Sequence, residues 1–226
     1  MTAGPKVGAY VPEHSARVAT PPPDASLLAS LRRLSGLSSS ASDALDALGL
    51  RLAVPSHALG LIGPDAVVVG RALTLRYLPT RTSSGGPPEG RLAHRTLFAL
   101  AEPGDVAVIS APSRIDASVM GGEALAAARE AGLAGIVVDG AVRDIDELVA
   151  LGLPVWAARR TQVTGRGRLE AAAINGPIEV AGVQVLPGDV VVADASGISF
   201  VPAAAFDGVA RRILGGDESD TFDGSR

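Results

Sequence analysis

The chain contains no cysteine and a single lysine among its 226 residues. Without cysteine it can form no disulfide, no thiolate metal site and no cysteine nucleophile. Lys6 lies in a stretch rich in proline and glycine, whereas Schiff-base chemistry needs a lysine desolvated inside a pocket. The GxxxxGK[ST] motif of a phosphate-binding loop does not occur. The composition therefore argues against imine-forming aldolases and P-loop nucleoside triphosphatases.

Long apolar runs and clustered positive charge are also missing. No apolar run approaches the length that crosses a bilayer, and the amino terminus lacks the charged-then-apolar pattern of a signal peptide. The formal net charge of -4 is spread along the chain and leaves no basic stripe for nucleic acid. We therefore expect a cytoplasmic protein that binds neither DNA nor membranes.

The chain is predicted to form one domain with a loose segment at each end. Residues 1–23 are rich in proline and glycine and are expected to be a flexible arm. Residues 24–214 hold the periodic apolar patterns, and a 47% hydrophobic content is ample for a buried core. Residues 215–226 are polar, which predicts a disordered tail.

Strands and helices alternate in the middle of the chain, which predicts parallel β-α-β units. The last third instead predicts an antiparallel contribution, which includes a hairpin over 178–185. A Pro-Gly-Asp-Val turn at 103–106 and another at 187–190 each lead into a strand. Gly70 interrupts a strand, which indicates a bulge or a close backbone approach. The expected strands are 66–78, 106–110, 136–139, 154–157, 190–193 and 198–201, and the expected helices are 24–36, 42–49, 94–101, 123–131, 145–151 and 203–214. The class is therefore α/β.

The segment Gly135–Asp144, GIVVDGAVRD, is the predicted functional centre. We expect its strand to end at Asp139 and to turn through Gly140, so that Arg143 and Asp144 lie outside the carboxyl end of the sheet, where ligands gather. The dipole at the following helix start favours an ionised Asp144, which is a hard ligand for a divalent cation. Arg143 can bind a carboxylate with its planar fork. The alternative is an Arg-Asp ion pair that stabilises a helix start.

A second candidate is the stretch Gly121-Gly122-Glu123 before a predicted helix. Two glycines there leave backbone N–H groups open to an anion, although glycines can also be chosen for dihedral freedom alone. This loop and the Arg143 loop follow neighbouring strands and should open at the same sheet edge. The histidines are poorer candidates: His94 is expected at a helix surface or cap, and no GxSxG motif supports a serine triad.

The motifs around these residues resemble the RraA-like family, which includes 4-hydroxy-4-methyl-2-oxoglutarate aldolases and protein regulators of ribonuclease E activity. The likeness is carried by GGEALAAAREAGLAGIVVDGAVRDIDEL (121–148), VVGRALTLR (68–76) and VAGVQVLPGDVVVADASGISFVP (180–202), and it covers roughly residues 25–212. It implies a swivelling β/β/α domain with a parallel β-α-β centre and added antiparallel hairpins. It also implies a homotrimer, or a hexamer formed as a dimer of trimers, with sites at subunit interfaces.

The resemblance assigns separate roles to the candidate residues. Arg143 would bind the carboxylate of a 2-keto acid substrate, and Asp144 would hold a Mg²⁺ or Mn²⁺ ion. Backbone amides of Gly121, Gly122 and Glu123 would hold the pyruvyl group. Aldolase members usually carry an acidic residue at the position of Gly122, so either Glu123 substitutes for it as a possible metal ligand or a contact to metal-bound water is missing. The family's DxDG sequence is also altered, to Asp194-Ala-Ser-Gly197.

These roles imply a metal-dependent lyase of the class II aldolase and decarboxylase type. It would cleave a C–C bond in a short 2-keto (di)carboxylate, such as 4-hydroxy-4-methyl-2-oxoglutarate or oxaloacetate, through a metal-stabilised pyruvate enolate. The absence of a usable lysine agrees with a metal-dependent route. Two alternatives stay open: a non-catalytic binding protein of the ribonuclease-regulator type, and a lyase or hydratase that acts on another substrate.

Overall fold

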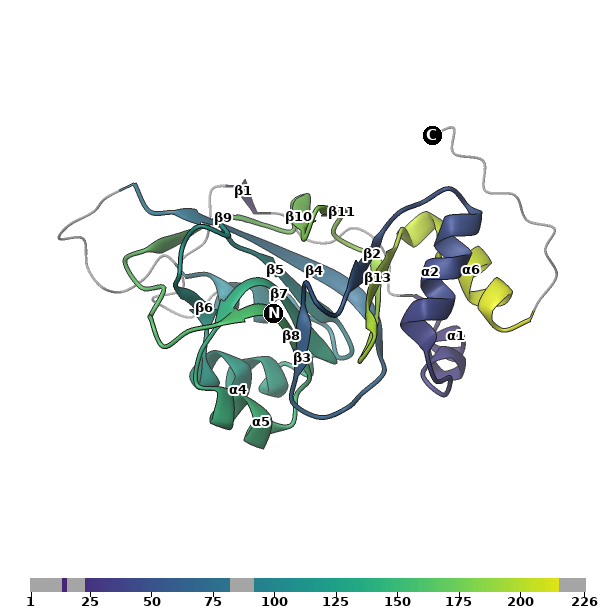
Figure 1. The fold of residues 1–226 in the computed structure, drawn as a ribbon, viewed down its shortest axis with the longest axis horizontal. Coiled ribbons are helices and arrows are strands. Elements are labelled where there is room, and N and C mark those ends of the chain that lie inside the picture. Colours follow the sequence, from purple (N-terminus) through teal and green to yellow (C-terminus); the bar gives the residue numbers. More distant parts are fainter. Residues whose placement is uncertain (1–13, 16–22, 82–91, 216–226) are drawn as a thin grey trace, which may run out of the picture.

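A mixed sheet forms the centre of the protein in the computed structural model, which describes residues 14–15, 23–81 and 92–215 (Figure 1). The strands are β1 (His14–Ser15), β2 (Ala53–Pro55), β3 (Gly60–Ile62), β4 (Val68–Pro79), β5 (Val106–Ser110), β6 (Ser118–Met120), β7 (Gly135–Val142), β8 (Val155–Arg160), β9 (Leu169–Ile174), β10 (Ile178–Val180), β11 (Val183–Val185), β12 (Val190–Asp194) and β13 (Gly197–Val201). The helices are α1 (Ala25–Leu31), α2 (Leu37–Ala47), α3 (His94–Phe98), α4 (Gly122–Glu130), α5 (Ile145–Leu151) and α6 (Phe206–Ile213), with a 3-10 turn at Ala203–Ala205.

The sheet has the parallel centre that the alternating pattern predicts. Its main path runs β2-β13-β12-β4-β5-β7-β8-β3, and β4, β5, β7 and β8 are parallel neighbours. Helix α4 leads into β7, and α5 leads from β7 to β8. Strands β12, β13, β2 and β3 add antiparallel edges, and β10–β11 forms a separate hairpin. The predicted α/β class is confirmed, and the hairpin bounds agree with those read from the sequence.

Strand alternation divides the core between the two faces of the sheet. Ala107 and Ile109 of β5 pack in the cluster that includes residues of α3, α4 and α5, whereas Val106 and Val108 pack with the β10–β11 hairpin. Trp156 is fully buried on the hairpin side. A third cluster joins α1, α2 and α6 to the β12–β13 end of the sheet (Figure 1). Helices α4 and α5 therefore lie together on one face, with the loops that precede them at one sheet edge.

The two Pro-Gly-Asp-Val turns pack against the first residues of β4, one on each side of the strand. In each turn the glycine has φ of +94°, and the aspartate carboxylate accepts the N–H of the residue three positions earlier at 2.8 Å. A Cβ on Gly70 would lie 2.2 Å from the carbonyl oxygen of Gly104, so the interruption of the strand is a close backbone approach. Next to it, buried Arg71 donates to both carboxylate oxygens of Asp105, at 3.0 and 2.9 Å.

Several predicted boundaries were wrong. The strand expected to stop at Asp139 continues through Gly140 to Val142, because its last residues pair with β6. The register against β8 shifts between Val138 and Ala141, so Gly140 marks an irregularity inside the strand and not a turn. Helix α2 starts at Leu37, five residues before the predicted helix at 42–49, and the helix expected over 94–101 ends at Phe98. Strands β2, β3, β6 and β9 were not predicted.

Some expectations concern segments outside the described residues. Residues 1–13 and 16–22 of the predicted arm and residues 216–226 of the predicted tail lie there. Within the predicted arm, His14–Ser15 form strand β1, which pairs in parallel with Ala173–Ile174 of β9. Among the described helices, none has the length and apolarity needed to cross a membrane.

Candidate active site

The two loops singled out in the sequence meet at one edge of the sheet. Strand β6 ends at Met120 and leads through Gly121 into α4, while β7 ends at Val142 and leads through Asp144 into α5. Strands β6 and β7 are parallel, and the N–H of Arg143 donates to the carbonyl of Met120 at 3.2 Å. The predicted juxtaposition is therefore present. The glycine loop follows the short β6 and not β5, because residues 111–117 separate the two strands.

Arg143 and Asp144 form an ion pair that lies against the start of α4. The Nε of Arg143 is 3.2 Å from Oδ2 of Asp144, and both side chains are about one-third exposed, at 36% and 38%. The same Oδ2 accepts the N–H of Gly122 at 3.3 Å. Asp144 has left-handed backbone angles, φ 56° and ψ 48°, and makes no side-chain cap to its own helix α5. The carboxylate thus interacts with the head of α4, whereas the sequence predicted a role at the head of α5.

The positions where Gly121 and Gly122 would carry side chains are occupied by the ends of neighbouring side chains. Gly121 has φ of -145°, which any residue can adopt, so dihedral freedom does not explain it. A Cβ there would lie 2.2 Å from Oδ2 of Asp144, and a Cβ on Gly122 would lie 1.8 Å from Oε2 of Glu147. The two glycines form a cradle that admits two carboxylates close to the backbone.

Glu123 does not take part in this cradle. Its exposed carboxylate pairs with Arg95 of α3 and lies 3.8 Å from a guanidinium nitrogen of Arg166. Arg166 belongs to the glycine and arginine loop that follows β8, so this ion pair connects the loop to the start of α4. Glu123 therefore connects three elements, and the structure records no contact between it and Asp144.

Glu147 was not singled out in the sequence. It is exposed and lies in the first turn of α5, three residues after Asp144, a spacing that places two helical residues on one face. That spacing was the available signal. The spacing alone does not predict that α5 packs against α4, and this packing places the Glu147 carboxylate against Gly122.

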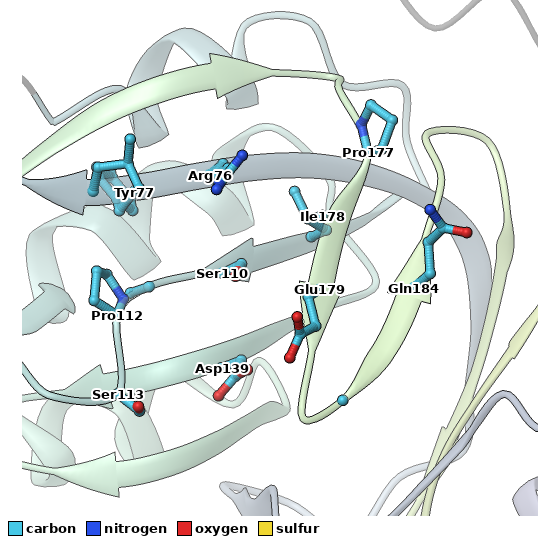
Figure 2. A pocket seen from close by; sticks show the side chains of 13 residues that line it. Arg76, Tyr77, Ser110, Pro112, Ser113, Asp139, Pro177, Ile178, Glu179 and Gln184 are labelled. Atoms are coloured by element: carbon cyan, nitrogen blue, oxygen red, sulfur yellow. The ribbon is translucent and has the colours of Figure 1, made fainter.

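A separate cavity of about 580 Å³ lies between the sheet and the β10–β11 hairpin. Figure 2 shows Arg76, Ser110 and Asp139 on the sheet, with Glu179 and Gln184 on the hairpin. Asp139 belongs to the segment predicted as the functional centre, and its carboxylate accepts the N–H of Ala181 at 2.8 Å. Neither Arg143 nor Asp144 lines this cavity. The fold therefore offers two places for a ligand.

The cradle fits a divalent cation that keeps part of its water shell. Within the described ranges, no group of three or more histidine, aspartate or glutamate side chains is arranged to hold a metal. Asp144 and Glu147 supply two carboxylates against adjacent backbone positions. Mg²⁺ is commonly bound through one or two carboxylates, with water and substrate oxygens as its other ligands. The donor set is therefore suitable for Mg²⁺ or Mn²⁺, and it is too sparse for a structural site made of protein ligands alone.

His94 is expected to make the stability of the protein depend on pH. Its Nδ1 is buried without a hydrogen-bond partner in the described part of the chain, so the predicted surface or capping role was wrong for this atom. Burial, together with the neighbouring Arg95, lowers the pKa of His94 to about 4. The unfolded chain takes up a proton near pH 6.5, so the free energy of unfolding should fall as the pH drops from about 6.5 towards 4.

Urea unfolding of the wild type should show a loss of about 2 kcal/mol that is absent in His94→Leu. His57→Leu, at an exposed position, is the control, and an equal pH dependence in all three proteins would contradict the prediction.

Curated relatives match the middle of the chain. A putative 4-hydroxy-4-methyl-2-oxoglutarate aldolase of Halalkalibacterium halodurans is 40% identical over 102 residues, which cover 45% of this chain and 48% of that protein. A protein of Thermus thermophilus named 4-hydroxy-4-methyl-2-oxoglutarate aldolase is 36% identical over 103 residues, 44% of this chain and 60% of the relative. These matches span less than two thirds of either relative.

Solved structures match over a larger part of the chain. The crystal structure of Streptomyces coelicolor RraAS2, described as an unusual member of the RNase ES inhibitor RraA protein family, is 31% identical. It superposes with a TM-score of 0.74 and covers 85% of this chain and 92% of its own. An RNA-processing inhibitor RraA from a Thermus species is 29% identical, with a TM-score of 0.57, covering 72% of this chain and 92% of its own.

The fold and the loops define an α/β protein with an arginine and two carboxylates at the edge of a mixed sheet. Residues 38–199 match the sequence model of the RraA-like family, described as Aldolase/RraA. This match covers more than half of the 226 residues. The chain belongs to the RraA-like family.

Proposed function

We propose that this protein is a divalent-metal-dependent lyase that cleaves a C–C bond in a short 2-keto (di)carboxylate. The observation that carries the proposal is the cradle: Arg143 and Asp144 lie together against two glycines at the start of α4. Oxaloacetate, which gives pyruvate and carbon dioxide, and 4-hydroxy-4-methyl-2-oxoglutarate, which gives two molecules of pyruvate, are the proposed substrates. The aldolase names of the curated relatives support this class of reaction.

Arg143 would position the substrate in this proposal. Its guanidinium is about one-third exposed at the mouth of the cradle and can bind a carboxylate through two parallel hydrogen bonds. The amides at the head of α4 add the favourable end of the helix dipole. Together they fix one end of the 2-keto acid, so that the bond to be cleaved has a defined orientation.

Asp144 and Glu147 would hold the cation, with Asp144 fixed by the N–H of Gly122. When bound, a Mg²⁺ or Mn²⁺ ion would polarise the keto oxygen and stabilise the negative charge that develops there. Arg143 would offset part of the same negative charge through its contact with the substrate carboxylate. The chain therefore supplies positioning and fixed charge, and it needs no lysine for this route.

The assembly belongs to the same proposal. We propose a homotrimer, or a hexamer of two trimers, in which a neighbouring subunit closes the exposed side of the cradle. The exposure of Arg143 and Asp144 in the single chain agrees with a site that is completed by a partner. Light scattering coupled to size exclusion should give three or six times the 22.7 kDa chain mass.

Release of pyruvate tests the proposed reaction. Purified protein incubated with Mg²⁺ and either oxaloacetate or 4-hydroxy-4-methyl-2-oxoglutarate should release pyruvate. A coupled lactate dehydrogenase assay measures the pyruvate. A chelator should reduce the rate to that of the buffer, and added Mg²⁺ or Mn²⁺ should restore it. Boiled protein with the same metal is the control, because free divalent cations also decarboxylate oxaloacetate. A rate equal to that control for both substrates would contradict the proposal.

A non-catalytic regulator is the second candidate. Two observations favour it: the glycine at position 122, where the family resemblance leads us to expect an acidic residue, and the similarity to two RraA structures described as belonging to ribonuclease or RNA-processing inhibitors. A regulator of this kind should release no pyruvate with either substrate and should instead inhibit an RNase E-type ribonuclease in a cleavage assay. The two candidates therefore give opposite results in the same pair of assays.

A further inference from the structure

The carboxylate of Glu147 lies where a side chain of residue 122 would begin. An ideal Cβ on Gly122 would be 1.8 Å from Oε2, 2.9 Å from Cδ and 3.1 Å from Cβ of Glu147. A larger residue at position 122 and the present position of Glu147 therefore exclude each other. Glycine at this position is matched to a carboxylate that arrives from α5.

The charges around Glu147 call for a cation. No hydrogen bond or ion pair joins its side chain to another residue in the described part of the chain. The nearby Asp144 carboxylate already shares Arg143, and Glu123 is engaged by Arg95 and Arg166. Two carboxylates that lie against adjacent glycines are favoured as a pair by a positive charge beside them, and Arg143 contacts Asp144 but is not recorded beside Glu147. A divalent cation supplies that charge.

We propose that Glu147 supplies the second carboxylate of the cation site, in place of a side chain at position 122. This inference rests on the proposed function, because it assigns a ligand to the same site. It differs from the expectation that Glu123 would take this place, since Glu123 points to the arginines of α3 and of the loop after β8. Glu147 acts from α5, on the same helix that begins at Asp144.

Binding of Mn²⁺ without substrate tests the assignment. Isothermal titration of the purified full-length protein should show Mn²⁺ binding that is weakened about tenfold or more in Glu147→Gln. Asp146→Asn is the matched control, because it removes a charge from the neighbouring exposed position of the same helix turn and should leave the affinity within about twofold of wild type. Glu123→Gln should likewise leave Mn²⁺ affinity close to that of wild type.

A second variant tests the steric relation. In Gly122→Ala the new methyl group takes the place of the Glu147 carboxylate, so Mn²⁺ affinity should fall by a similar factor. Combined with Glu147→Gln, it should cause little further loss, whereas independent effects would multiply. Wild-type binding with unchanged affinity in Glu147→Gln would overturn this inference and leave the metal dependence of the lyase standing. Absence of Mn²⁺ binding in the wild type would overturn both.

Discussion

Replacing Arg143 by alanine should lower the rate of pyruvate release from oxaloacetate by a factor of about 10²–10³. The reason is that Arg143 is the cation of the cradle that can bind the substrate carboxylate and offset the charge that develops during cleavage. Initial rates at saturating Mg²⁺ should show the loss in kcat/KM. Arg143→Lys keeps the charge but loses the planar fork, so it should recover part of the rate at most.

Arg76→Ala is the matched control for this prediction. Arg76 lines the 580 Å³ cavity under the β10–β11 hairpin, away from the cradle (Figure 2). If the reaction takes place in the cradle, Arg76→Ala should keep close to the wild-type rate. The reverse pattern, an inactive Arg76→Ala with an active Arg143→Ala, would move the reaction to the cavity. Loss of the exposed Arg143–Asp144 pair should cost no more than about 1 kcal/mol, so urea unfolding can exclude misfolding.

The fold was predictable where local patterns and long-range packing agree. Residues 106–109 and 136–138 are continuous apolar runs, and such runs form buried parallel strands. The hairpin at 178–185 was predictable because apolar and polar residues alternate on both sides of Ala181-Gly182, and in the structure both turn residues take positive φ. In contrast, β9 has the sequence LEAAAI, in which Ile174 is the one β-branched residue and no residue is aromatic, so its strand propensity is low. Its pairing with β4 is set by packing and not by propensity.

The site was predictable in its position and less so in its contacts. The spacing of strands and helices placed Arg143 and the glycine loop at one sheet edge, because parallel strands end on the same side. The predicted end of β7 was wrong because a single glycine such as Gly140 is typical of a turn, whereas pairing with β6 extends the strand to Val142. Glu147 depends on the contact between α4 and α5, for which a single sequence carries no local signal.

Replacing Asp105 by asparagine should cause the largest loss of stability, about 3 kcal/mol or more in the free energy of unfolding. Asp105 is 3% exposed and binds both Nε and a terminal nitrogen of Arg71, which is itself 5% exposed. The carboxylate raises the pKa of the Arg71 guanidinium through these hydrogen bonds. Without it, a buried guanidinium keeps the exposed carboxylate of Glu102 at 3.3 Å as a weaker partner. Urea unfolding at neutral pH measures the loss.

Asp189 provides the matched control, because it occupies the same position in the second Pro-Gly-Asp-Val turn. Its carboxylate accepts the N–H of Leu186 as that of Asp105 accepts the N–H of Glu102, each at 2.8 Å, but the structure records no arginine beside it. Burial raises the pKa of Asp189, so neutralising this side chain should cost about 1 kcal/mol. Adding Arg71→Met to Asp105→Asn should restore part of the lost stability, since it removes a buried charge that has lost its bidentate carboxylate partner. Equal losses in Asp105→Asn and Asp189→Asn would show that both carboxylates act through their turns alone and that the buried ion pair contributes nothing specific.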